Sequence, residues 1–423
     1  MIWTLAVIPF ALLFLGTPIF AIFLFGAAAT FVLFLSVSPL ALQQIMFGGL
    51  DNYALLAIPF FIFAGDLMSG TGIADRLTAW VLALIGRIPG SLGVATVGAC
   101  TLIGAISGSS TAVVAAVAPT LYPGLIRDGY GTRFSAGLVS ASGSIDILIP
   151  PSIAMILYGA SAEQSVPKLF AAGVLPGLLF ALMMSAFVIV RALSAGVRTT
   201  ARFDFPHLVR TTWQAIPALF MPVFVLSGIY LGWFSPTEAG GFACLYAILV
   251  GRYVYRSISW RDVLNSASRS ALVTAQIMVI VAAASLFSWI LTVNGVPQAL
   301  TSALKSLDLA PWSFLMAINC VLLIVGCFLD PTSAILVLTP LFMPLVKSVG
   351  IDPIHFGIVM TANIAIGMFT PPFGLNLFVA QSVLGIPLET LYRGVLPFAV
   401  VQISALMIVT YWPALSLYLA NAV

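Results

Sequence analysis

The chain has 423 residues, of which 61% are hydrophobic and 7% are charged, and its formal net charge is +3. A soluble domain needs a surface that is roughly a quarter charged, so this composition excludes a soluble protein and indicates an all-α polytopic membrane protein. A membrane β-barrel is excluded because the apolar runs are continuous and do not alternate with polar residues. The four cysteines lie in apolar runs without metal-ligand spacing, so we expect them to be packing residues.

Apolar runs of about 20 residues, the length that crosses a bilayer, recur along the first half. An interruption at Gly16-Thr17-Pro18 predicts two short helices in residues 2–35. Two successive prolines remove backbone donors and break a helix at Pro150-Pro151. The remaining expected elements are a loop at 36–53, a span at 54–69, an amphipathic surface stretch at 74–87, arms at 92–106 and 111–126 that are each short for a crossing, a broken helix at 133–160, a span at 169–190 and a polar loop at 191–212.

The second half repeats this order. Pro340 lies 221 positions after Pro119, and the pair Pro371-Pro372 lies 221 positions after Pro150-Pro151. The chain is therefore an internal duplication. The expected elements of the second half are spans at 213–232 and 236–250, a polar loop at 251–269, a span at 270–292, a surface stretch at 296–308, arms at 312–328 and 332–348, a broken helix at 354–383 and a final span at 391–412.

The duplication predicts two structural repeats, in each of which the two short arms form a re-entrant hairpin. We expect a first repeat at 1–192 and a second at 213–423, joined by a cytoplasmic loop at 193–212. Each repeat divides into a scaffold part and a part with the hairpin and the broken helix: 1–90 and 91–165 in the first, 213–310 and 311–385 in the second.

The basic residues predict the sidedness of the chain. If the hairpins return to their own side and the broken helices cross, all 13 arginines lie on one side and the three lysines, Lys168, Lys305 and Lys347, on the other. This division agrees with the positive-inside rule when the arginine side is cytoplasmic. The two halves then run in opposite directions through the membrane, and inverted repeats are typical of secondary transporters.

The hairpin tips and helix breaks are the candidate ion sites. Freed backbone carbonyls in a membrane are tolerated where they line a cavity or bind an ion, and hydroxyl and carbonyl oxygens suit Na⁺ better than a transition metal. The alternative is that small residues such as Gly108 only let helices pack closely. The expected first Na⁺ site comprises Ser107, Ser109, Ser110 and the carbonyl groups before Pro150, among them that of Ile149, and the expected second site comprises Thr332, Ser333, Gly367, Thr370 and Pro371.

Three acidic residues lie within apolar segments, where burying a charge costs at least about 2.5–3.5 kcal/mol. Asp330 at the second tip and Asp146 before the first break are expected to be functional, whereas Asp66 is equally compatible with a place at the membrane interface. Nothing resembles a catalytic nucleophile with its base, a phosphate loop or a nucleic-acid patch, so no enzyme activity and no nucleic-acid partner are expected. The candidate substrate residues are Asp330, Ser109, Thr332 and Asn376.

These motifs carry a resemblance to a known family. The cluster Gly108-Ser-Ser-Thr111, the break Ile149-Pro-Pro-Ser-Ile153, Thr370-Pro-Pro-Phe-Gly374, Gly394-Val-Leu-Pro397 and Leu15-Gly-Thr-Pro18 resemble the large membrane subunit of the tripartite ATP-independent periplasmic (TRAP) transporters over essentially the whole chain. The resemblance implies a multi-pass protein of the bacterial inner membrane that takes up an organic acid together with Na⁺ by an elevator movement. It also implies two partners, a small four-helix membrane subunit and a periplasmic substrate-binding protein. Residue by residue, the resemblance implies that Asp146, Ile149 and Pro151 belong to the first Na⁺ site and that Asp330 lies where the substrate is approached.

Two other functions remain open from the sequence. A stand-alone Na⁺/carboxylate symporter of the same inverted-repeat design would need no periplasmic protein. A non-transporting membrane subunit of a respiratory complex would carry lysines and glutamates along mid-membrane helices, whereas the three lysines here map to loops or surface stretches.

Overall fold

The computed structural model describes residues 2–34, 38–86, 88–197, 204–306 and 310–423, and this part of the chain is helical without strands. Within these ranges five helices are long and apolar enough to cross a membrane, or seven if each of two bent pairs counts as one span. The predicted all-α membrane fold is therefore confirmed.

The first half begins with two short helices, as predicted, and Gly16 takes a positive φ of 72° between them. The two arms and the broken helix also form where the sequence places them. The helices of this half are α1 (Ile2–Phe14), α2 (Ile19–Phe34), α3 (Pro39–Leu50), η1 (Tyr53–Leu56), α4 (Ala57–Ser69), α5 (Ile73–Ile85), α6 (Ser91–Ser107), α7 (Ser110–Arg127), α8 (Thr132–Gly143), η2 (Ser144–Leu148), α9 (Ile153–Ala162) and α10 (Val166–Ala195).

The second half follows the same order from α11 to α19 and adds a short final helix, α20, that the sequence analysis did not predict. The α20 helix packs against α10. The elements are α11 (Phe205–Tyr230), α12 (Pro236–Leu249), η3 (Val250–Val254), α13 (Trp260–Val293), α14 (Val296–Ser306), α15 (Pro311–Gly326), α16 (Pro331–Ser348), α17 (Pro353–Gly367), α18 (Leu375–Leu384), α19 (Leu388–Tyr411) and α20 (Pro413–Ala420).

Three predicted loops are partly or wholly helical. The loop expected at 36–53 contains α3, which Ser38 caps by accepting a hydrogen bond from the Leu40 N–H. The loop expected at 251–269 ends at Ser259, whose capping box with Asp262 starts α13. In the loop expected at 191–212, α10 continues to Ala195 and α11 begins at Phe205, and residues 198–203 lie outside the described residues. The polar residues at these positions cap helices or lie in their first turns. Because such residues are also common in loops, their polarity alone led to the prediction of loops.

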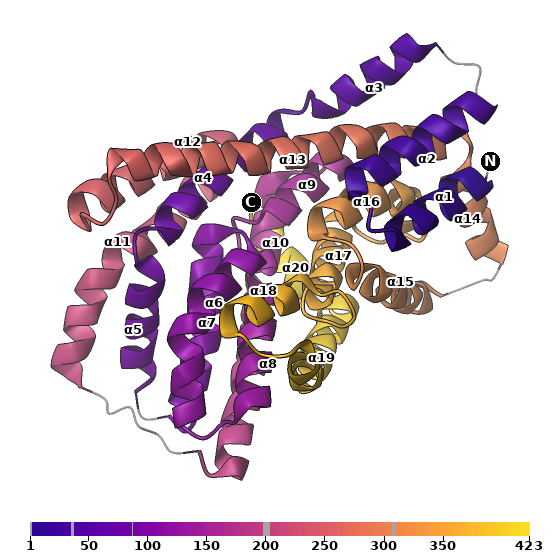
Figure 1. Ribbon diagram of the computed structural model, residues 1–423. Helices are drawn as coiled ribbons and strands as arrows, with labels where there is room; N and C mark the ends of the chain where they lie inside the picture. Colours follow the sequence, from indigo (N-terminus) through magenta and orange to yellow (C-terminus); the bar gives the residue numbers. More distant parts are fainter. Residues whose placement is uncertain (1, 35–37, 87, 198–203, 307–309) are drawn as a thin grey trace.

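The two repeats pack on each other reciprocally. The second arm of each hairpin lies against the half-helix after the proline break of the other repeat, so α7 packs on α18 and α16 packs on α9. The scaffold helices pair in the same crosswise manner, α4 with α12 and α13 with α2. This exchange brings both tips and both breaks to the middle of the molecule, with α5, α11 and α12 to one side and α1, α2 and α14 to the other (Figure 1).

The scaffolds of the two repeats differ at one point. A 60° bend separates α3 from the segment Tyr53–Ser69, whereas α13 continues without a break for 34 residues. The bend falls at Asp51-Asn52, and the Asn52 side chain accepts a hydrogen bond from the Ala54 N–H. The positions 223 residues later are Thr274-Ala275, which do not offer this local cap, so the helix continues.

Candidate functional site

The tip of the first hairpin is a sharp turn between α6 and α7. Gly108 takes a φ of +61°, a conformation that favours glycine, and a Cβ there would lie 3.4 Å from the carbonyl oxygen of Pro151. The tip therefore touches the proline break of its own repeat, as the sequence predicts. On the scaffold side, a Cβ on Gly65 of α4 would lie 2.7 Å from the Ser107 carbonyl oxygen, so α4 also approaches the tip closely.

The hydroxyl groups of this tip have different partners. The Ser109 and Thr111 hydroxyls lie 3.2 Å apart. Ser109 is the N-cap residue of α7, but its side chain accepts no hydrogen bond from a backbone N–H of the first turn. Ser110 is buried and contacts Asn376, whose Nδ2 lies 2.7 Å from the Ser110 Oγ and also donates to the Ser140 carbonyl at 3.1 Å. Asn376, a predicted substrate residue, is fully buried and ties α18 of the second repeat to the first hairpin.

At the second tip, Asp330 is the N-cap of α16. Its carboxylate accepts hydrogen bonds from the backbone N–H and the hydroxyl of Ser333. The Thr370 hydroxyl near the second break donates to the Ile366 carbonyl at 2.6 Å. A Cβ on Gly367 would overlap the backbone of Gly326 on α15, so the break segment lies directly on the first arm of the second hairpin.

One cavity of about 630 Å³ joins residues of both repeats. It brings together four predicted site residues, Ser107, Ser109 and Ser110 from the first tip and Thr332 from the second. Its other walls are the segment around the first break, α7, and the scaffold helices α4 and α13; among their lining residues are Ile147, Ser152, Ala115, Asp66 and Val273.

The other predicted residues do not line this cavity. Asp330 lies on a second cavity of about 500 Å³, together with Gly16 and Thr17 of the α1–α2 turn and the side chains of Phe328 and Phe373. Met368 and Leu375 border both cavities. The remaining predicted residues are not in the lining of the first cavity: Asp146, Ile149 and Pro151 belong to the first break, Gly367, Thr370 and Pro371 to the second, and Ser333 and Asn376 lie on α16 and α18.

Asp146 is a fully buried carboxylate in the described part of the chain. Both of its carboxylate oxygens lack a hydrogen-bond partner among the described protein atoms, and its Cα–Cβ bond packs against Gly104 of α6, where an added Cβ would lie 2.7 Å from the Asp146 Cα. An isolated charge in an apolar interior is very costly, so this group fits a site where a cation supplies the missing partner. The described residues contain no cluster of histidine, cysteine and acidic side chains suited to a transition metal.

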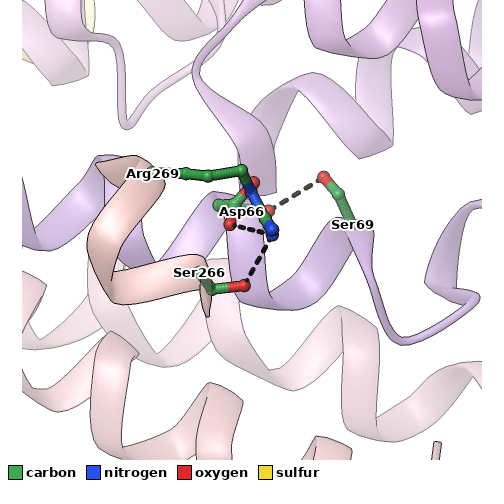
Figure 2. A network of polar contacts seen from close by, with 5 residues as sticks. Asp66, Ser69, Ser266 and Arg269 are labelled. Carbon is green, nitrogen blue, oxygen red and sulfur yellow. Dashed lines mark hydrogen bonds and ion pairs between the residues drawn. The ribbon is translucent and has the colours of Figure 1, made fainter. Parts of the chain in front are cut away.

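An ion pair at the edge of the first cavity was not predicted from the sequence. Figure 2 shows Arg269 of α13 beside Asp66 of α4, with an Nη2–Oδ2 distance of 2.8 Å. The sequence placed Arg269 in a loop and left Asp66 without a partner. The two residues are separated by 203 positions, and no spacing or motif links them, so only the fold could bring them together.

Comparisons with known proteins show the family of this chain. Residues 6–415 match the model of the tripartite ATP-independent periplasmic transporter family, DctM component. The chain belongs to this family. A C4-dicarboxylate TRAP transporter large permease protein from Pseudomonas aeruginosa is 42% identical over 94% of this chain and 93% of its own length. An ectoine/5-hydroxyectoine TRAP transporter large permease protein from Ruegeria pomeroyi is 38% identical over 97% of this chain and 96% of its own.

A solved structure supports the fold of this TRAP large permease. The crystal structure of the Alcanivorax borkumensis YdaH transporter has a TM-score of 0.62 and covers 96% of this chain and 98% of its own, at 16% sequence identity. At that identity the likeness concerns the fold alone. The resemblance read from the tip and break motifs is confirmed, and a respiratory-complex subunit is no longer a candidate.

Proposed function

We propose that this chain is the transport subunit for Na⁺-coupled uptake of a small organic acid across the bacterial inner membrane. Its partners are a small four-helix membrane subunit and a periplasmic substrate-binding protein that delivers the acid. The observation that carries the proposal is the cavity of about 630 Å³ that is lined by hydroxyl-bearing residues from both hairpin tips.

The charge balance of the cavity supports coupling to a cation. Its described lining contains no arginine or lysine and one carboxylate, Asp66. A carboxylate substrate therefore needs positive charge from another source, which Na⁺ bound at the tips and breaks supplies. The N-terminus of α7, which begins at Ser110, adds a smaller favourable dipole.

The ion sites proposed here combine residues that line the cavity with residues of the two breaks. Ser107, Ser109 and Ser110, with Asp146 and the carbonyls of Ile149 and Pro151, form the first; Thr332 and Ser333, with Gly367, Thr370 and Pro371, form the second. Binding of Na⁺ would fix the orientation of the tips at which the substrate contacts Ser109 and Thr332. Asp330 would act at the substrate through the second cavity, and Asn376 indirectly, by holding Ser110.

An elevator movement fits the division of the cavity walls. The hairpins and breaks form one wall, and the scaffold helices α4 and α13 form the other. Movement of the first group along the second would carry the cavity from one side of the membrane to the other while both ion sites stay intact.

The test is uptake into proteoliposomes that contain this chain and the small subunit. Succinate and other organic acids are offered with the binding protein under an inward Na⁺ gradient, and the same gradient of K⁺ is the control. Uptake that needs both Na⁺ and the binding protein supports the proposal. Na⁺-dependent uptake without the binding protein would instead establish the stand-alone symporter.

A further inference from the structure

The ion pair between Arg269 and Asp66 lies where the first cavity meets the scaffold. The Arg269 Nη2 donates to the Asp66 Oδ2 at 2.8 Å and to the Ser266 Oγ at 2.9 Å. Asp66 and two neighbours on α4, Gly65 and Ser69, line the cavity, and the Ser69 hydroxyl donates to the Gly65 carbonyl (Figure 2). The guanidinium is thus one contact away from the cavity wall.

Stability does not account for this pair. The Arg269 side chain is 61% exposed and that of Asp66 is 32% exposed, and exposed ion pairs contribute only about 0–1 kcal/mol. The helices that carry the pair also pack on each other. We therefore look for the role of this pair in its position beside the cavity and not in the free energy of folding.

The pair marks one end of the cavity. From the tip at Ser110, the lining follows α7 through Ala112, Ala115 and Ala116, and it follows α4 as far as Ser69, the last residue of that helix. The arginine distribution predicts that α7 and α4 both end on the cytoplasmic side. The cavity thus leads from the hairpin tips toward the cytoplasm, with Asp66 and Arg269 at its cytoplasmic end.

The chemistry of Arg269 suits an organic anion. A guanidinium has five N–H donors in a planar fork that matches a carboxylate. Here Nη2 makes both bonds, and Nη1 and Nε donate to no described residue. A substrate carboxylate could bind these free donors, while the Asp66 carboxylate competes for the same positive charge and prevents the anion from being held tightly.

We propose that Arg269 is an anion-binding station at the cytoplasmic end of the cavity, where the carboxylate of the departing organic acid replaces Asp66 before release. This inference rests on the proposed function, because it assumes that the cargo is an organic anion. Arg269 then acts on release rather than on delivery from the periplasmic side.

An electrostatic measurement tests the station without knowledge of the substrate. The measurement uses the variant Ala115→Cys on a Cys320→Ser background, in the assembled transporter in inside-out membrane vesicles. The introduced cysteine is modified by two methanethiosulfonates of similar size, one anionic (sulfonatoethyl) and one cationic (trimethylammonioethyl). Arg269→Gln should lower the ratio of anionic to cationic rates about threefold, and Asp66→Asn should raise it. Arg269→Lys, which keeps the charge, should preserve the ratio. Arg261→Gln is the matched control, because it removes an exposed arginine two turns earlier on α13.

A transport measurement then tests the role in release. Succinate loaded on the cytoplasmic side should inhibit Na⁺-driven uptake, and Arg269→Gln should raise the half-inhibitory concentration about tenfold while Arg261→Gln leaves it unchanged. Unchanged labelling ratios, or equal inhibition in the two variants, would overturn the station. Absence of Na⁺-dependent uptake by the wild type would count against the proposed function instead, and the labelling ratios would still decide whether Arg269 attracts anions.

Discussion

Both repeats pack the segment before the proline break against the first arm of the hairpin, but through different residues. In the first repeat the segment before the proline break presents Asp146 to Gly104, and in the second the equivalent segment presents Gly367 to Gly326. One contact buries a carboxylate without a protein partner and the other brings two glycine backbones together. The duplication thus preserves the approach of arm and break, while the residues at the two proposed ion sites differ.

The tips differ in a related way. Position 109 is a serine that lines the first cavity, and position 330, its equivalent 221 residues later, is an aspartate that caps its own helix. Both tips contribute hydroxyl-bearing residues to the shared cavity, but the acidic group of the second tip caps α16 and lies outside that lining. We expect the two repeats to have unequal roles in transport.

The largest effect should come from closing the glycine contact. Gly367→Ala would force its Cβ into the backbone of Gly326, which cannot move like a side chain, so we expect loss of folded protein in size-exclusion profiles. Gly326→Ala is the milder partner, because its Cβ would lie 3.3 Å from the Gly367 Cα. Equal yields of folded protein from the two variants would contradict the close contact.

The second prediction separates the charge of Asp330 from its capping role. Asn is as good a helix cap as Asp, so Asp330→Asn should retain α16 and lower uptake by more than about tenfold, as expected when a transition-state or ligand interaction worth about 1.4 kcal/mol or more is lost. Uptake assays and the thermal unfolding temperature are measured together. Near-normal transport with an unchanged unfolding temperature would show that the carboxylate serves only as a cap.

The third prediction converts the first repeat to the pattern of the second. Asp146→Gly removes the buried carboxylate, so we expect the protein to be more stable in Na⁺-free buffer and to gain less stability on adding Na⁺. Thermal unfolding with NaCl, and with choline chloride as the ionic-strength control, reads this difference. An unchanged gain from Na⁺ would remove Asp146 from the first ion site.

The smallest effects should come from single hydroxyls. Ser109→Ala and Thr332→Ala each remove one oxygen from a different proposed site, so each should raise the Na⁺ concentration for half-maximal uptake a few-fold, which corresponds to about 1 kcal/mol. Ser313→Ala is the control, because Ser313 lies in the first turn of α15 and lines neither cavity. If neither cavity variant changes the Na⁺ dependence, these residues only allow the tips to pack.

The sequence was informative where local rules decide the backbone. The proline pairs, Gly108 and the 221-residue repeat predicted the hairpins, the breaks and their meeting at the first tip. Three features depended on the tertiary arrangement instead: the link from Asn376 to Ser110, the capping of α16 by Asp330, and the pair of Asp66 with Arg269. In each case the role of the polar side chain cannot be decided from its own sequence segment. A polar side chain in an apolar segment can bind a ligand, cap a helix or form a hydrogen bond with a neighbouring helix.

The central claim is that two sodium sites, one in each repeat, drive uptake, and the Na⁺ dependence of initial uptake rates tests it most directly. For the wild type in proteoliposomes with the binding protein, we predict a sigmoidal dependence with a Hill coefficient above 1, and a coefficient that falls toward 1 in Asp146→Gly. The same rate of uptake in Na⁺ and in K⁺ would contradict the account.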